Sequence, residues 1–210
     1  MIVIVDYGVG NLRSIANMFR KIGHAAEISS DPETIERATK LVLPGVGAFD
    51  HGMIELTKRG LLPVLNRKVL DEGTPVIGLC LGMQLLARSS EEGSVPGLGW
   101  IDAEVVRLAL PPGSPLKVPH MGWNQVRAVR PHPLLQDSTD ETRFYFVHSY
   151  HLRCADDSAV IGTTEYGYEF PSVVGQGNVM GVQFHPEKSH RFGMRLLTSF
   201  AAGAPLPAGR

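Results

Sequence analysis

Short runs of aliphatic and β-branched residues alternate with helical patterns through the first half of this 210-residue chain. The runs at residues 2–5, 25–28, 41–43 and 75–79 predict buried strands, and a helical pattern follows each of them. This alternation is typical of parallel strands joined by crossover helices. The sequence therefore predicts an α/β fold with a doubly wound, mostly parallel sheet.

The second half of the chain has shorter predicted strands, at residues 144–147, 159–163 and 179–184, separated by turns rich in Gly and Pro. These strands predict an antiparallel extension of the sheet, followed by a closing helix from about Arg191 to Phe200. Because no repeat or low-complexity linker interrupts the pattern, we expect a single domain over residues 1–200. Residues 201–210, rich in Ala, Gly and Pro, are expected to form a frayed tail.

The charge and cysteine content of the chain limit the classes of function that it can have. The formal net charge is -1 at pH 7 without a long block of either sign, so the chain lacks an electrostatic footprint for nucleic acid or anionic lipid. Cys80 and Cys154 are too few for a disulfide framework. No basic leader precedes the first strand, and no apolar run approaches the ~20 residues of a membrane helix. We expect a soluble, cytoplasmic protein whose partner is a small molecule or another protein.

A cysteine lies where the strand at residues 75–79 meets the next helix. The segment Gly78-Leu79-Cys80-Leu81-Gly82 has the form of a nucleophile elbow with cysteine in place of serine. Such a turn would place the thiol at a helix N-terminus, which favours thiolate, and would aim the Leu81 N–H at a developing oxyanion. A lone cysteine, by contrast, is more often a buried residue that fills a strand end.

His185 and Glu187 are the candidate base and the group that orients it. Both follow the strand predicted at residues 179–184, and residues two apart in an extended chain face the same side. His185 would take the thiol proton and Glu187 would hold the imidazole in the productive tautomer. Without the cysteine elbow, the same pair would be interpreted as a capping histidine and a solvated glutamate.

A glycine-rich loop, Pro44-Gly45-Val46-Gly47, follows another predicted parallel strand, at the sheet edge where α/β folds bind ligands. Its glycines would allow the Val46 or Gly47 N–H to serve as a second oxyanion donor, although glycines also occur in ordinary turns. Gln84 lies one turn beyond Cys80 on the same helix face, where its amide would reach a substrate or would simply be a polar helix residue.

Neither a cofactor nor a metal is expected. Gly8-Val9-Gly10 lacks the third glycine of a dinucleotide-binding loop, because Arg13 occupies that position. His148 and His151 have no cluster of cysteines or carboxylates beside them, so hydrogen bonding is favoured over metal ligation.

Together, the elbow, the His-Pro-Glu segment and the Pro-Gly loop resemble the class I, triad-type glutamine amidotransferases, and the likeness runs from Ile2 to about Phe200. Residues 6–12, 44–49, 119–124 and 184–189 are similar to the glutaminase subunits of imidazole glycerol phosphate synthases. The resemblance implies that the chain cuts ammonia from glutamine for a separate (β/α)8 cyclase subunit in histidine biosynthesis. The products would be imidazole glycerol phosphate and aminoimidazole carboxamide ribotide.

The same resemblance implies two further groups of residues. Those that would help to hold glutamine are Gln84, Glu92, His148, Ser149 and Tyr150. Those that would lie near the cyclase are Asn11, Trp123, Asn124, Tyr145 and Lys188.

Three alternatives remain beside this reading. A class I glutaminase that serves anthranilate, guanylate or pyridoxal phosphate synthesis would share the chemistry, but residues 8–11 and 123–124 argue against it. A non-catalytic regulatory subunit would be expected to have lost Cys80, His185 or Glu187, and all three are present. The third is a γ-glutamyl or peptide hydrolase that works alone. Glutamate release with and without a cyclase would separate them.

Overall fold

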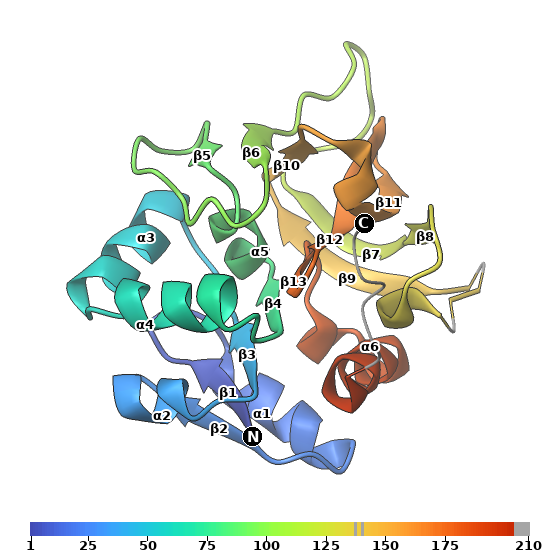
Figure 1. Ribbon diagram of the computed structural model, residues 1–210. Coiled ribbons are helices and arrows are strands. Elements are labelled where there is room, and N and C mark those ends of the chain that lie inside the picture. The colour runs from blue at the N-terminus through green and yellow to red at the C-terminus, as the bar shows by residue number, and fades with distance from the viewer. Residues whose placement is uncertain (137, 140, 204–210) are drawn as a thin grey trace.

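A sheet of eight strands, in the order β2-β1-β3-β4-β13-β12-β11-β8, crosses the computed structural model, which describes residues 1–136, 138–139 and 141–203 (Figure 1). The parallel strands are β1 (Ile2–Val5), β2 (Ala26–Ser29), β3 (Lys40–Leu43), β4 (Val76–Leu79) and β13 (Val179–Val182). The antiparallel strands are β12 (Glu169–Gln176), β11 (Val160–Glu165) and β8 (Arg127–Ala128). The predicted α/β sheet with an antiparallel extension is confirmed.

Helices cover both faces of this sheet. They are α1 (Leu12–Lys21), α2 (Pro32–Glu36), α3 (Phe49–Lys58), α4 (Leu62–Asn66), the π-helix η1 (Arg67–Asp71), α5 (Leu81–Leu85) and α6 (His190–Ala202). Val3 and Val5 of β1 pack in one apolar cluster with α2 to α5, whereas Ile2 and Ile4 pack in a second cluster with α1 and α6. Strand side chains alternate between faces, so a fully apolar strand is required in the middle of such a fold.

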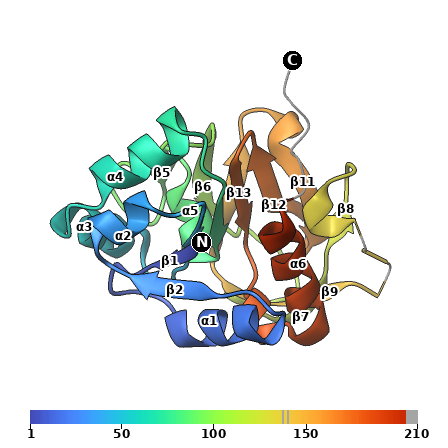
Figure 2. The same cartoon turned by 60° about the horizontal axis from the view of Figure 1, so that its bottom comes forward.

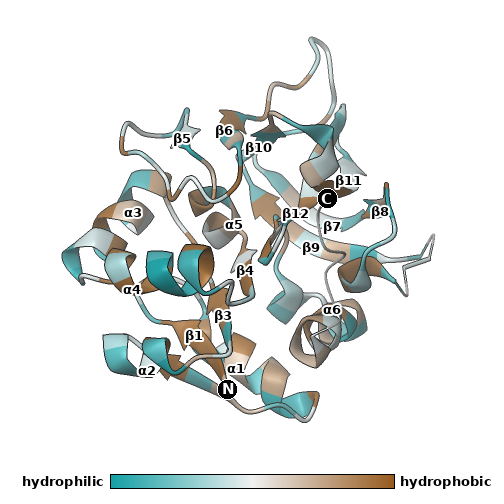
Figure 3. Ribbon diagram, viewed as in Figure 1, coloured by the Kyte–Doolittle hydropathy of each residue, from teal (hydrophilic) through white to brown (hydrophobic). Residues whose placement is uncertain are grey.

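The figures show this layering. In Figure 2, α1 and α6 lie apart from α2, α3 and α4, with the sheet between the two groups. In Figure 3, β1 and β3 are brown, hence hydrophobic, between helices that also carry teal, hydrophilic turns. None of the helices in the described part of the chain is long and apolar enough to cross a membrane.

Two smaller sheets lie beside the main one. They consist of β10 (Tyr150–Cys154), β6 (Ala103–Arg107) and β5 (Ser89–Ser90), and of the antiparallel pair β7 (His120–Gln125) and β9 (Arg143–His148). Short 3-10 helices are η2 (Pro133–Leu135), η3 (Asp157–Ala159) and η4 (Pro186–Lys188). The sequence predicted most of β9 and β11 but missed β6, β7, β10 and β12, because these strands depend on partners that are distant in the chain.

Several predicted boundaries differ from the structure. The strand expected over residues 179–184 ends at Val182. The helix that follows Cys80 ends at Leu85, and Ser89 and Ser90 pair with β6. Asn11 precedes α1 but its side chain forms no capping hydrogen bond. Asp31 caps α2, because its side chain accepts from the Glu33 and Thr34 N–H groups, and Pro32 occupies the first turn.

The closing helix also differs at its end. It was expected to stop near Phe200, but α6 continues to Ala202, and Gly203 follows in the left-handed conformation. The first residues of the expected tail are therefore helical, while residues 204–210 lie outside the described part of the chain.

Candidate active site

Cys80 lies at the turn between β4 and α5, with φ 53° and ψ -110°. A positive φ is uncommon for a residue with a side chain and persists only where its surroundings impose it. Here the Cys80 N–H donates to the Val182 carbonyl at 2.8 Å. A Cβ atom on Gly82 would lie 1.8 Å from the Leu43 carbonyl oxygen, so only glycine fits there. The predicted elbow geometry is present.

His185 and Glu187 form a buried pair. His185 Nδ1 lies 2.9 Å from Glu187 Oε1, and each side chain is 3% exposed. The extended geometry expected for this segment is wrong, because Pro186–Lys188 is the 3-10 helix η4. This turn brings the Glu187 carboxylate to the His185 ring. The Ser189 hydroxyl stabilises the turn by donating a hydrogen bond to the His185 carbonyl at 2.6 Å.

The His185 imidazole interacts with both Cys80 and Glu187. Burial lowers the pKa of His185, but the interactions with Cys80 and Glu187 raise it, and the net effect is a pKa raised to about 9. Because Glu187 engages Nδ1, the other ring nitrogen is left for chemistry. Within the described residues, neither His185 Nε2 nor Glu187 Oε2 has a hydrogen-bond partner.

A cavity of about 500 Å³ opens above Cys80 and His185. Small-molecule sites typically span roughly 300–1,000 Å³. The cavity brings together every residue that was expected in the oxyanion hole or at glutamine, and Glu187 lies behind it. Its walls are Val46, Gly47, Ala48, Cys80, Leu81, Gln84, Glu92, Pro119, Val147, His148, Ser149, Tyr150 and His185.

The glycine-rich loop forms one wall of this cavity. The Val46 side chain is 43% exposed. Gly47 has φ +106°, and no atom lies within 4 Å of the position that a Cβ would take. Leu81 begins α5, so its N–H is among the helix donors without an intrahelical acceptor. The loop and the elbow thus face the same space from two sides.

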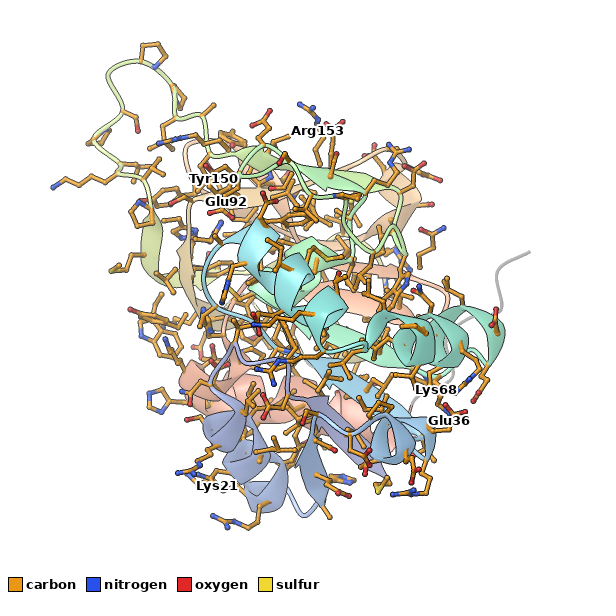
Figure 4. All side chains as sticks on the ribbon, turned by 90° about the vertical axis from the view of Figure 1, so that its left-hand side faces the viewer. Lys21, Glu36, Lys68, Glu92, Tyr150 and Arg153 are labelled. Atoms are coloured by element: carbon orange, nitrogen blue, oxygen red, sulfur yellow. The ribbon has the colours of Figure 1, made fainter. Side chains whose placement is uncertain are left out.

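The opposite wall carries the residues expected to hold glutamine. The Gln84 amide donates to the Tyr150 carbonyl at 2.9 Å, so its donor already has a protein partner. One oxygen of Glu92 accepts the Phe49 N–H at 2.8 Å, at the start of α3. Figure 4 shows the labelled Glu92 and Tyr150 close together, as expected for residues that line one cavity.

Gln183 is a residue of the site that sequence reasoning missed. It is fully buried, its Oε1 accepts from Gln84 at 3.2 Å, and its Nε2 donates to Cys80 Sγ at 3.9 Å. A polar residue inside the apolar run 179–184 was the available signal. Pro119 also lines the cavity.

The residues expected near a partner subunit gather on one surface, except Asn124. Trp123 is 44% exposed and meets the Tyr145 ring edge-on at 6.2 Å, and Lys188 Nζ lies 5.7 Å from the centre of that ring. Asn11 is exposed just before α1, which packs against η4. The Asn124 side chain turns inward and donates to the Glu165 carbonyl at 2.9 Å.

His148 and His151 both form hydrogen bonds within the protein. His148 Nδ1 donates to the Tyr150 carbonyl at 2.8 Å, and His151 Nε2 lies 2.7 Å from the Tyr168 hydroxyl. Across the described ranges, no three His, Cys, Asp or Glu residues gather as a metal site would require.

The profile of the family described as Glutamine amidotransferase class-I matches residues 3–203. A solved glutamine amidotransferase superimposes with a TM-score of 0.72 at 22% identity, covering 96% of this chain and 98% of that one. PurLQS from Thermotoga maritima gives 0.71 at 17% identity, covering 96% and 97%. Fold, site and profile agree: this chain is a member of the class I glutamine amidotransferases.

Relatives of higher sequence identity indicate the family within the class I glutamine amidotransferases. The chain is 53% identical to imidazole glycerol phosphate synthase subunit HisH 2 of Methanococcus maripaludis, over 95% of this chain and 98% of the relative. It is 50% identical to the HisH 2 subunit of Pseudomonas aeruginosa, with the same coverage. At this similarity the chain belongs to the HisH family of glutaminase subunits.

Proposed function

We propose that Cys80, His185 and Glu187 act as a catalytic triad that hydrolyses glutamine to glutamate and ammonia. The observation that carries this proposal is the shared cavity of Cys80 and His185, with the His185–Glu187 pair buried behind it. The raised pKa of His185 favours an imidazolium at neutral pH. In the proposed mechanism this proton comes from the Cys80 thiol, which becomes the nucleophile. The thiolate attacks the side-chain amide carbon, and the imidazolium protonates the leaving ammonia. Water, deprotonated by His185, then cleaves the thioester and releases glutamate.

The developing oxyanion needs donors on the side opposite His185. The Leu81 N–H is one, and the Val46 or Gly47 N–H is the second. The loop position of Val46 and the positive φ of Gly47 support a peptide that reorients to complete the hole. Glutamine would then bind productively only when this peptide faces the cavity.

Glutamine itself would be held by the wall opposite the loop. The free oxygen of Glu92 supplies a negative charge for the α-ammonium group. Gln84, His148, Ser149 and Tyr150 shape the remainder of this wall.

The acceptor of the ammonia is a (β/α)8 cyclase subunit, which binds this chain as a heterodimer in the cytoplasm and forms imidazole glycerol phosphate and aminoimidazole carboxamide ribotide. The names of the relatives, as subunits of imidazole glycerol phosphate synthase, support this partner. The half-exposed Trp123 with Tyr145 and Lys188 supports a docking surface, with the exposed Asn11 beside it.

Cys80→Ala tests whether Cys80 serves glutamine hydrolysis alone and not the synthesis that uses ammonia. The variant complex should no longer release glutamate from glutamine but should still form product from added ammonium salt. Cys154→Ala is the matched control, because Cys154 lies in β10, outside the cavity lining, and should leave both activities intact. Loss of ammonia-dependent synthesis in Cys80→Ala would contradict the proposal, since Cys80 would then serve more than the glutaminase step.

A further inference from the structure

A buried histidine stands between two cavities. His120 in β7 is 2% exposed and lies directly opposite His148 in β9. His148 lines the glutamine cavity, whereas His120 and Asn124 line a second cavity of about 840 Å³. The His120 ring is stacked at 3.9 Å on Tyr166 and at 4.7 Å on Phe146, so its plane is fixed.

Only one assignment of donors and acceptors satisfies the hydrogen bonds around His120. The Tyr150 carbonyl can only accept, so His148 Nδ1 carries the proton at that 2.8 Å contact. Burial lowers the pKa of His148 to about 3 and that of His120 to about 4, which keeps both rings neutral. His148 Nε2 is therefore an acceptor, and His120 Nδ1 must donate to it at 3.0 Å. His120 Nε2 then accepts from the Asn124 amide at 3.2 Å.

The chain of bonds continues to the nucleophile. The Tyr150 carbonyl accepts a second hydrogen bond from Gln84, whose amide also donates to Gln183 Oε1 at 3.2 Å. The Gln183 amide in turn donates to Cys80 Sγ at 3.9 Å. The Tyr150 carbonyl therefore accepts from both His148 and Gln84, so the His148 ring that His120 holds shares this acceptor with the hydrogen bonds that reach Cys80.

We propose that His120 is a positioning residue of the glutamine cavity, which holds His148 through the Nδ1–H donor and is itself held by Asn124. The proposal rests on the proposed function, because it assigns His148 and Tyr150 to the wall that binds glutamine. His120 is not among the described residues that line the glutamine cavity, and its hydrogen bonds go to His148 and Asn124. It acts by fixing the His148 ring and, through it, the Tyr150 carbonyl.

Two amide substitutions separate hydrogen bonding from packing. An asparagine amide can occupy the place of His Nδ1, so His120→Asn keeps a donor to His148 and loses the contact with Asn124. A glutamine amide reaches the place of His Nε2, so His120→Gln keeps the contact with Asn124 and loses the donor to His148. Glutamine is closer to histidine in volume, so a purely packing role predicts that His120→Gln is the milder change.

The decisive measurements are the glutamine KM and kcat of the assembled complex and the ring ¹⁵N resonances of His148 in the full chain. His120→Gln should raise KM by roughly tenfold, the loss of about one hydrogen bond, with a smaller change in kcat. Its His148 Nε2 resonance should move to that of a nitrogen without a hydrogen bond. His120→Asn should retain nearly the original KM and resonance.

Asn124→Ala provides a further control. It should change the KM of the original protein as little as His120→Asn does, because both substitutions remove the link between residues 120 and 124 and keep the donor to His148, and it should have little additional effect in His120→Asn. A milder effect of His120→Gln than of His120→Asn, or unchanged His148 resonances in both, would overturn the proposal. If the unsubstituted complex fails to hydrolyse glutamine, the proposed function fails, and the ¹⁵N measurement still decides the role of His120.

Discussion

The Tyr7 hydroxyl donates a hydrogen bond to the Pro44 carbonyl, where the glycine-rich loop leaves β3. Tyr7 is fully buried, and burial together with the nearby Cys80 raises the pKa of the phenol, so the hydroxyl keeps its proton. The start of the loop is thereby anchored, ahead of Val46 and Gly47, to the segment that follows β1.

Tyr7→Phe should lower the free energy of unfolding by about 1–3 kcal/mol, because the buried Pro44 carbonyl loses its partner. Urea denaturation measures this change. Tyr166→Phe is the control for stability, since its hydroxyl donates to the Lys117 carbonyl at an exposed site where water can replace it. Equal losses of unfolding free energy in the two variants would show that the buried Tyr7 hydrogen bond stabilises the fold no more than the exposed Tyr166 hydrogen bond does.

The His185 pair predicts a pH dependence of stability. Its pKa is raised from 6.5 to about 9 in the folded state, so the folded state binds this proton more tightly than the unfolded chain does. The resulting stabilisation is fully present below pH 6.5 and is lost as pH rises through about 9. The free energy of unfolding of the original protein minus that of His185→Asn should shrink across this window. A difference that stays constant would contradict the assignment.

Trp123→Ala should weaken the affinity for the cyclase by about 2 kcal/mol or more, as expected for an aromatic anchor at an interface. Because Trp123 is 44% exposed, the melting temperature of the lone subunit should change little. Trp100 is 6% exposed and donates to Asn66, so Trp100→Ala should lower the melting temperature instead. Titration calorimetry with the cyclase and thermal denaturation distinguish the two. The reverse pattern would assign Trp123 to the core.

Gly47→Pro should slow glutamine turnover by the complex by ~10²–10³-fold while glutamine still binds, because one oxyanion donor is removed. Proline also requires φ near about -65°, which the observed +106° excludes. Gly47→Ala retains the N–H and should be less impaired. Turnover is measured for the lone subunit, for the complex, and for the complex with cyclase ligand. Equal rates in all three for the original protein would rule out a loop that responds to the partner.

The elements that could be predicted from the amino-acid sequence are those whose signals are local. The apolar runs of β1, β3 and β4 and the glycines around Cys80 predicted the sheet and the elbow, because burial on both faces and a tight turn each demand particular residue types. His185 and Glu187 were found by their closeness in the chain. The expected extended geometry was wrong, since η4 joins them.

Contacts between distant segments became known from the folded chain alone. The approach of β9 to β7 places His148 against His120, and β13 carries Gln183 to Cys80. These contacts join residues far apart in the chain, and the strands that form them are stabilised by cross-strand packing rather than by intrinsic propensity. A sequence pattern records which residues can be buried. The partner that each buried polar group finds is fixed by the register and topology of the folded sheet.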